Sequence, residues 1–208
     1  MKVVAISDTH GKHALLKLPK GDMIIHAGDI SDQGAEREVR EFLEWFSGLN
    51  YQYKIFIAGN HDFYFEKEPA DKISKLIPEG VTYLNDSGVT VNGIKVWGSP
   101  VTPWYFNWAF NRHRGKAIKK HWDLIPPDTN ILVTHGPAYG ALDQNRKGEH
   151  LGCKDLCEKI THSKIPFHVC GHIHEGYGIT HRLGTKFINC SVLDERYRLA
   201  HAPVQFVI

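Results

Sequence analysis

Five apolar runs in this chain each end in a short polar motif, and this recurrence limits the possible fold more than any other feature. The runs occupy residues 2–6, 23–27, 53–58, 131–134 and 167–170. Compact runs of this kind, rich in β-branched residues, predict buried β-strands. The motifs that follow them are Asp8-Thr9-His10, Gly28-Asp29, Gly59-Asn60-His61-Asp62, Thr134-His135-Gly136 and Gly171-His172-Ile173-His174. We therefore expect the strand ends to bring these motifs together at one edge of a sheet.

Amphipathic helical stretches lie between the predicted strands. The clearest covers residues 35–46, where Val39, Phe42, Leu43 and Phe46 recur at helical spacing. Further strands are expected at residues 81–84, 89–91, 94–97, 178–181, 186–189 and 204–207, with a hairpin turn at Asn92-Gly93. We predict a single domain over residues 1–208 of α/β (α+β) class, a four-layer sandwich in which two packed mixed β-sheets are flanked by helices.

The bulk composition is ordinary for a globular chain of 208 residues. The formal net charge of +2 gives no reason to expect a dedicated nucleic-acid surface. No apolar run is long enough to span a membrane, and the N-terminal run is too short for a secretory signal, so we expect a cytoplasmic location. The cysteines form no Cys-x-x-Cys pair, which favours reduced, packed thiols over a zinc site or disulfides. They are Cys153, Cys157, Cys170 and Cys190.

The side chains in the five motifs are of the kinds that bind metal ions. Asp8 and Asp29 offer two carboxylates, Asn60 offers a carboxamide, and the histidines offer several imidazoles. This is enough for two divalent cations that share one ligand, and such a centre suits displacement at phosphorus. Asp8 and His10 alternate with Thr9, so an extended strand end would point both to one side. Gly28 would let the backbone of Asp29 approach the site closely. The mixed oxygen and nitrogen donors favour Mn²⁺, Fe, Zn²⁺ or Co²⁺.

Each motif alone also has a simpler explanation, since an aspartate before a turn is often a helix cap. Under that reading, five polar clusters that each follow a buried strand need five separate explanations. Polar groups left unpaired at the edge of a core would also be costly. The combined pattern therefore favours a metal centre over five unrelated structural roles.

The motif set resembles that of the calcineurin-like metallophosphoesterases, whose pattern reads D-x-H, G-D, G-N-H-D/E, a later H and G-H-x-H. The resemblance extends from Asp8 to His174. A closer similarity is to the metallophosphoesterase-domain-containing (MPPED, or 239AB) subfamily. It is found in Gly98-Ser99-Pro100, Pro103-Trp104, Phe106-Asn107-Trp108, Thr134-His135-Gly136-Pro137 and Gly171-His172-Ile173-His174-Glu175-Gly176-Tyr177-Gly178. This similarity implies a β-sandwich flanked by helices and metal-dependent phosphodiesterase activity.

The resemblance also assigns a role to each motif residue by its position. It implies that a hydroxide held between the two ions attacks phosphorus, that His61 faces the leaving oxygen, and that Asp32 orients His61. A structural role for His61 stays open as the alternative. The first ion would be bound by Asp8, His10, Asp29 and His174, and the second by Asp29, Asn60, His135 and His172, with Asp29 as the bridge.

One departure from the family pattern bears on the substrate. Gln33 stands where many family phosphatases have an arginine that helps to hold a phosphate dianion. Two divalent ions, two carboxylates and one hydroxide leave a single formal positive charge, which matches a phosphodiester monoanion. We therefore expect a small-molecule phosphodiester as substrate, with cyclic nucleotides suggested by the resemblance and Mn²⁺ as the first metal to test. Arg112 or Arg114 could still reach the site, so a phosphomonoesterase stays open, as do a nuclease and a non-catalytic metal-binding scaffold.

The segment from Trp97 to Arg114 is rich in aromatic residues and has no regular periodicity. It could form a wall of the site and stack a nucleobase, or its rings could close the edge of the core. His26 is expected in the core or behind the ligands. The other histidines lie outside the motifs and are not expected to take part in the chemistry.

Overall fold

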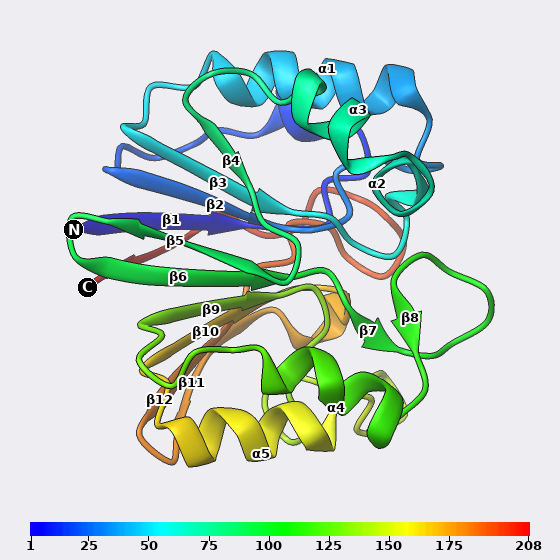
Figure 1. Cartoon of the computed structure of the whole chain (residues 1–208), viewed down its shortest axis with the longest axis vertical. Coiled ribbons are helices and arrows are strands. Elements are labelled where there is room, and N and C mark those ends of the chain that lie inside the picture. The colour runs from blue at the N-terminus through cyan, green and yellow to red at the C-terminus, as the bar shows by residue number, and fades with distance from the viewer.

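The computed structural model describes all residues from 1 to 208, and they form four layers (Figure 1). The first sheet has the strand order β13-β1-β2-β3-β4. Four of its strands are mutually parallel, and β13 runs antiparallel to β1 at one edge. The bounds are β1 (Lys2–Ile6), β2 (Met23–Ala27), β3 (Tyr53–Ile57), β4 (Val81–Tyr83) and β13 (Val204–Val207).

The second sheet has the order β11-β12-β10-β9-β6-β5 and is also mixed, because its two edge strands run antiparallel to the rest. The turn between β5 and β6 is Asn92-Gly93, with φ angles of 48° and 78°, as a tight hairpin requires. A separate two-stranded ribbon, β7 with β8, follows β6. The bounds are β5 (Ser87–Val91), β6 (Ile94–Ser99), β7 (Thr102–Pro103), β8 (Asn111–Arg112), β9 (Ile131–Thr134), β10 (Phe167–Cys170), β11 (Gly178–Arg182) and β12 (Thr185–Asn189).

Helices form the two outer layers. In Figure 1, α1 and its neighbours cover the first sheet, and α4 and α5 cover the second. The N-terminus of α1 is capped by the Glu38 carboxylate, which accepts a 2.9 Å hydrogen bond from the Ala35 amide. None of the helices has the length and apolar character that crossing a membrane requires. The bounds are α1 (Glu36–Ser47), α2 (Phe63–Lys67), α3 (Ala70–Leu76), α4 (Lys116–Asp123) and α5 (Lys154–Ser163), with short 3₁₀ turns η1 (His13–Leu15) and η2 (His174–Gly176).

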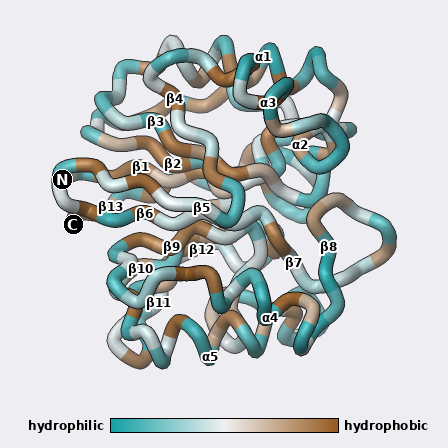
Figure 2. The backbone as a smooth tube through the Cα atoms, in the orientation of Figure 1, coloured by the Kyte–Doolittle hydropathy of each residue, from teal (hydrophilic) through white to brown (hydrophobic).

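Three apolar clusters fill the spaces between the layers. Side chains alternate across each strand, so Val4 of β1 packs under α1 while Val3 packs between the two sheets. Trp122 of α4 is fully buried in the third cluster, beneath the second sheet. Figure 2 shows the same arrangement, since apolar stretches coincide with the strands and the outer helices alternate between polar and apolar turns.

The predicted fold class and layer arrangement are confirmed. All the strands expected from the sequence are present, with ends that differ by no more than two residues. The helix expected over 35–46 begins and ends one residue later. The four cysteines are free thiols, and all except Cys157 are buried, as predicted.

Candidate metal centre

The five motifs meet at the edge of the two sheets where β1, β2, β3, β9 and β10 end. A cavity of about 190 Å³ opens there. Its lining combines motif residues with aromatic and polar residues from two loops. The lining residues are Asp29, Asn60, His61, Pro103, Tyr105, Trp108, Asn111, His172, His174 and Tyr197.

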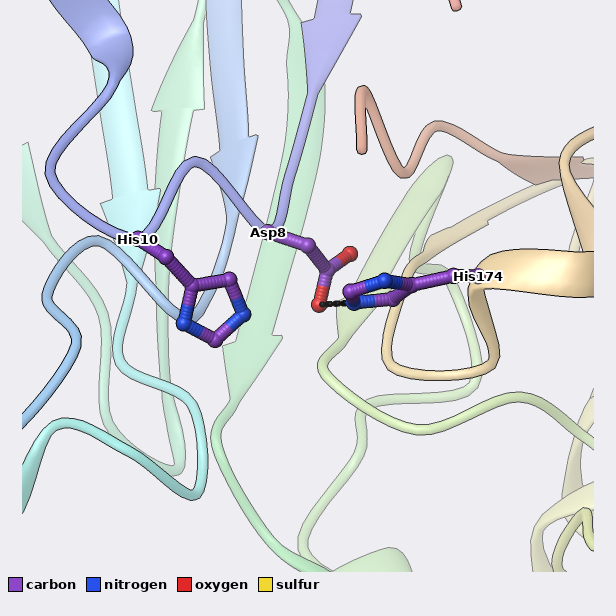
Figure 3. A group of neighbouring side chains, drawn as sticks. All are labelled: Asp8, His10 and His174. Carbon is purple, nitrogen blue, oxygen red and sulfur yellow. Dashed lines mark ion pairs between the residues drawn. The ribbon is translucent and has the colours of Figure 1, made fainter. Parts of the chain in front are cut away.

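Asp8, His10 and His174 form one cluster of metal-binding side chains (Figure 3). Asp8 and His10 come from the loop after β1, and His174 reaches them from the turn after β10. The Nε2 atom of His174 lies 3.5 Å from Oδ1 of Asp8. Asp8 is completely buried, and its carboxylate also accepts hydrogen bonds from the hydroxyls of Ser7, at 2.5 Å, and Ser191, at 2.7 Å.

Asp29, His135 and His172 form a second cluster beside the first. The Nδ1 atom of His135 lies 2.9 Å from the Ala27 carbonyl and must donate to it, which leaves Nε2 to face the cluster. This Nε2 atom is 3.2 Å from Oδ2 of Asp29 and 2.8 Å from Oδ1 of Asn60. Asn60 therefore joins this cluster.

Asp29 lies between the two clusters. Its Oδ2 atom is 3.6 Å from Nε2 of His10 on one side and 3.2 Å from Nε2 of His135 on the other. Its Oδ1 atom accepts a 2.8 Å hydrogen bond from the His61 amide, which fixes the carboxylate. A single carboxylate oxygen thus faces one nitrogen from each cluster.

The backbone adopts left-handed conformations at four of these residues. The φ angles are 55° at Asp8, 41° at His10, 55° at Asp29 and 67° at His172. Each non-glycine residue in this region costs roughly 1–2 kcal/mol, and such strain is concentrated at functional sites. The expectation that Asp8 and His10 share one side of an extended strand is therefore wrong. Strand β1 ends at Ile6, and the turned backbone brings the two side chains together instead.

The sequence profile of the calcineurin-like phosphoesterases matches residues 1–176. The chain belongs to this family. Human metallophosphoesterase domain-containing protein 1 is 40% identical over 226 residues, which cover 98% of this chain and 69% of the human protein. A UPF0046 protein of Caenorhabditis elegans is 36% identical over 220 residues, which cover 100% of this chain and 75% of that protein. These similarities confirm the resemblance seen in the motifs.

Solved structures show the same fold. The phosphopantetheinyl hydrolase PptH of Mycobacterium tuberculosis superposes with a TM-score of 0.64 at 17% identity, over 94% of this chain and 90% of that one. Family membership and the clustered donor atoms together support a metal-dependent phosphoesterase.

The donor atoms of this phosphoesterase fit divalent ions. Both ring nitrogens of His10 are buried and have no hydrogen-bond partner, a rare and costly condition unless a further ligand is bound. Burial lowers the pKa of His10, so the neutral ring has a lone pair to offer. In each cluster the donor atoms lie within 4.8 Å of one another, and carboxylate, imidazole and carboxamide groups form a set that Mn²⁺, Fe, Zn²⁺ and Co²⁺ accept.

Two buried ion pairs dominate the electrostatics of the site. Burial would raise the pKa of Asp8, but the hydrogen bond and charge of His174 hold it well below its usual range. Burial would lower the pKa of His174, but Asp8 outweighs this effect and raises it to about 9. Asp29 and His135 behave in the same way, and the pKa of His135 is also raised to about 9. The carboxylates are therefore ionised, and metal binding must displace protons from their histidine partners.

Three glycines in the motifs allow the ligands to come this close. A Cβ atom on Gly28 would overlap the His135 ring and the Ala58 carbonyl. One on Gly59 would overlap Asp29 and His135, and one on Gly171 would overlap the Asp8 carboxylate. No residue with a side chain fits at these positions unless a ligand moves.

The contact between Asp32 and His61 differs from the expected one. The Nδ1 atom of His61 lies 2.8 Å from the main-chain carbonyl of Asp32, so this carbonyl, not the carboxylate, fixes the edge of the ring. The Asp32 side chain is 55% exposed, and its Oδ1 atom is 4.0 Å from Nδ1 of His10. Gln33 donates a 3.2 Å hydrogen bond to the other carboxylate oxygen.

Two residues that build the site were given no role in the sequence analysis. The buried Asp62 carboxylate accepts hydrogen bonds from the amides of Ile30, Ser31 and Gly59, and so ties the loop that holds Asp29 to the loop that holds Asn60. Tyr197 packs edge-on against the His10 ring, with centroids 4.8 Å apart. The place of Asp62 in a recognised motif could have indicated a role in the site. The residues around Tyr197 form no motif that could have indicated one.

Proposed function

We propose that this chain hydrolyses phosphodiesters with two divalent ions, of which Mn²⁺ is the first candidate. The first ion would be held by Asp8, His10, Asp29 and His174, and the second by Asp29, Asn60, His135 and His172. The observation that carries the proposal is the position of the Asp29 Oδ2 atom, which faces His10 on one side and His135 on the other. A carboxylate oxygen placed in this way is suited to bridge two ions.

Bound ions would supply positive charge against the phosphoryl oxygens and lower the pKa of a water molecule to the neutral range. The chain itself would supply the group that acts on the leaving oxygen. With Nδ1 of His61 donating to the Asp32 carbonyl, Nε2 is left for a ligand in the cavity that His61 lines. In the protonated ring this nitrogen can donate to the leaving oxygen as negative charge develops there.

The charges around the cavity favour a diester over a monoester. Arg112 does not line the cavity, because its Nη1 atom bonds the Glu66 carboxylate at 3.2 Å and the Asn111 carbonyl at 2.8 Å. Arg114 bonds the carbonyls of Gly152 and Leu151, each at 2.7 Å. Because both guanidinium groups are engaged in these contacts, neither arginine is available to neutralise a phosphate dianion. A phosphodiester has only one negative charge to balance.

The aromatic residues at the cavity suit a substrate with a planar substituent. Tyr105 and Tyr197 line the cavity from two different loops and are 64% and 40% exposed. Exposed aromatic rings of this kind stack nucleobases. Other parts of the same segment serve the core, since Ala109 and Phe110 are buried. Among small diesters we therefore favour nucleotides, including the cyclic ones.

A matrix of metals and substrates tests this proposal. Metal-free protein would be reloaded with Mn²⁺, Fe²⁺, Zn²⁺ or Co²⁺ and assayed on an aryl phosphodiester, cyclic nucleotides, single-stranded DNA and an aryl phosphomonoester. We expect kcat/KM for the aryl diester to exceed that for the monoester, and Asp29→Asn to abolish both activities. A monoester preference, rapid cleavage of DNA, or no hydrolysis with any metal would instead indicate a phosphomonoesterase, a nuclease or a scaffold.

A substitution at Gln33 tests the charge argument separately. Gln33→Arg should raise monoester hydrolysis relative to diester hydrolysis, because it adds a cation beside Asp32 and His61. Gln33→Ala is the matched control and should leave the ratio unchanged. An unchanged ratio in the arginine variant would contradict the argument from charge.

A further inference from the structure

We propose that Trp108 is a positioning residue for His61, and that its indole holds the imidazole in the orientation needed at the leaving oxygen. This inference rests on the proposed function of His61. It assigns to the β7–β8 segment a role in catalysis that is separate from any contact with substrate.

The rings of Trp108 and His61 are stacked. Their centroids are 4.2 Å apart and their planes differ by 29°. The His10 ring meets His61 edge-on, with centroids 4.6 Å apart. The hydrogen bond from Nδ1 to the Asp32 carbonyl is a single contact about which the ring could still rotate. The indole and the His10 ring remove that freedom.

Trp108 is itself held firmly, because the residues that follow it are anchored at the site and in the core. The adjacent Ala109 amide donates a 3.1 Å hydrogen bond to the carbonyl of Asn60, the residue immediately before His61. Ala109 and Phe110 are buried in the core cluster between the first sheet and α1. The amide of Thr102 donates to the Phe110 carbonyl at 3.1 Å, and this contact ties the segment back to β7. Figure 1 shows the segment between β7 and β8, which contains Trp108, beside the ends of the sheets.

The neighbouring aromatic residues show that this contact is specific to Trp108. Trp104 is 50% exposed and stacks on His113, with centroids 5.4 Å apart. Tyr105 and Phe106 contact each other and are 64% and 63% exposed. Of the aromatic residues in this loop, Trp108 alone stacks on His61. A proton donor displaced by about 1 Å can lose 10²-fold in rate, so this support has a direct catalytic use.

Leaving-group dependence separates a positioning role from a structural one. The metal-loaded full chain and its Trp108→Leu and Trp108→Phe variants would be assayed on methyl aryl phosphates whose phenols differ in acidity. We expect Trp108→Leu to lower kcat roughly tenfold for the ester of the least acidic phenol. For the p-nitrophenyl ester the loss should be less than about twofold, because p-nitrophenolate leaves without needing a proton from His61. Trp108→Phe keeps an aromatic face and should stay close to wild type. Trp104→Leu removes an indole from the same loop and should leave kcat unchanged for every ester in the series.

A double mutant separates this role from substrate stacking. In a His61→Ala background, Trp108→Leu should change kcat by less than about twofold, since the group that it positions is gone. An equal loss across the leaving-group series, or the same loss with and without His61, would overturn the proposal. In that case Trp108 acts on the substrate or on the fold.

A spectroscopic measurement distinguishes failure of this inference from failure of the proposed function. The Cε1–H resonance of His61, assigned by comparison with His61→Ala, should lie upfield because of the indole ring current, and Trp108→Leu should remove that shift. If the chain hydrolyses no ester, the proposed function fails and the positioning role fails with it, whatever the spectrum shows. If diesters are hydrolysed but the resonance does not move in Trp108→Leu, the positioning role alone is refuted.

Discussion

Acid should destabilise this fold through a histidine that lies outside the metal centre. His168 on β10 is fully buried, and its Nε2 atom lies 2.7 Å from the Thr134 hydroxyl. That hydroxyl donates to the Gly136 carbonyl, so it must accept from His168, and the ring is therefore the Nε2–H tautomer. The Nδ1 atom is buried without a partner. Protonation would place an unpaired N–H and a charge in the core.

The size of the stability loss in acid follows from the shifted pKa of His168. Burial lowers the pKa of His168 from its ordinary value of 6.5 to about 3. The unfolded chain therefore binds more protons than the folded one between these values, and stability present above pH 6.5 is lost as the pH falls towards 3. The slope is about 1.4 kcal/mol per pH unit, which amounts to roughly 2 kcal/mol at pH 5. His168→Gln cannot take up this proton.

Urea unfolding of metal-free protein in EDTA, at pH 7, 6, 5 and 4, measures the effect. His168→Gln should be less stable than wild type at pH 7, because it loses ring packing, and should regain about 1.4 kcal/mol relative to wild type for each unit of pH below 6.5. His181→Gln, at an exposed position on β11, is the matched control and should follow the wild-type profile. A difference between wild type and His168→Gln that does not change with pH would refute the reasoning.

Two further substitutions test how the ligands are held. Gly171→Ala should weaken metal binding by roughly 10–100-fold in a calorimetric titration, since its Cβ overlaps the Asp8 carboxylate, and an unchanged affinity would contradict that overlap. Asp62→Ala leaves the buried amides of Ile30, Ser31 and Gly59 without an acceptor. It should lower the free energy of unfolding in urea by roughly 2–5 kcal/mol and should also weaken metal binding. The buried Asp143, whose carboxylate holds a loop away from the cavity, is the control. Asp143→Ala should lower stability and leave metal affinity unchanged, and equal affinities in the two variants would count against the role of Asp62.

The sheet architecture could be predicted from the sequence because burial dictates it. Runs such as residues 2–6 and 131–134 are apolar throughout, as expected for strands covered on both faces, and they form β1 and β9 as predicted. The turn at Asn92-Gly93 follows from the preference of these residues for positive φ. Each of these features is encoded by residues that are adjacent in the chain.

The finer structure of the site depends on contacts between distant residues, and the sequence could not supply them. Ser191 bonds Asp8 across 183 positions, and Trp108 from the β7–β8 segment stacks on a histidine from the loop after β3. The left-handed backbone at Asp8 is set by its amide, which donates to the Gly28 carbonyl at 2.9 Å. Aspartate adopts this conformation only occasionally, and at Asp8 the surrounding structure imposes it.

Anomalous diffraction at the manganese edge, from crystals of the chain soaked in Mn²⁺, tests the central claim most directly. The account predicts two peaks, both in contact with the Asp29 carboxylate. One should lie beside Asp8, His10 and His174, and the other beside Asn60, His135 and His172. A single peak, or peaks that do not share Asp29, would contradict it.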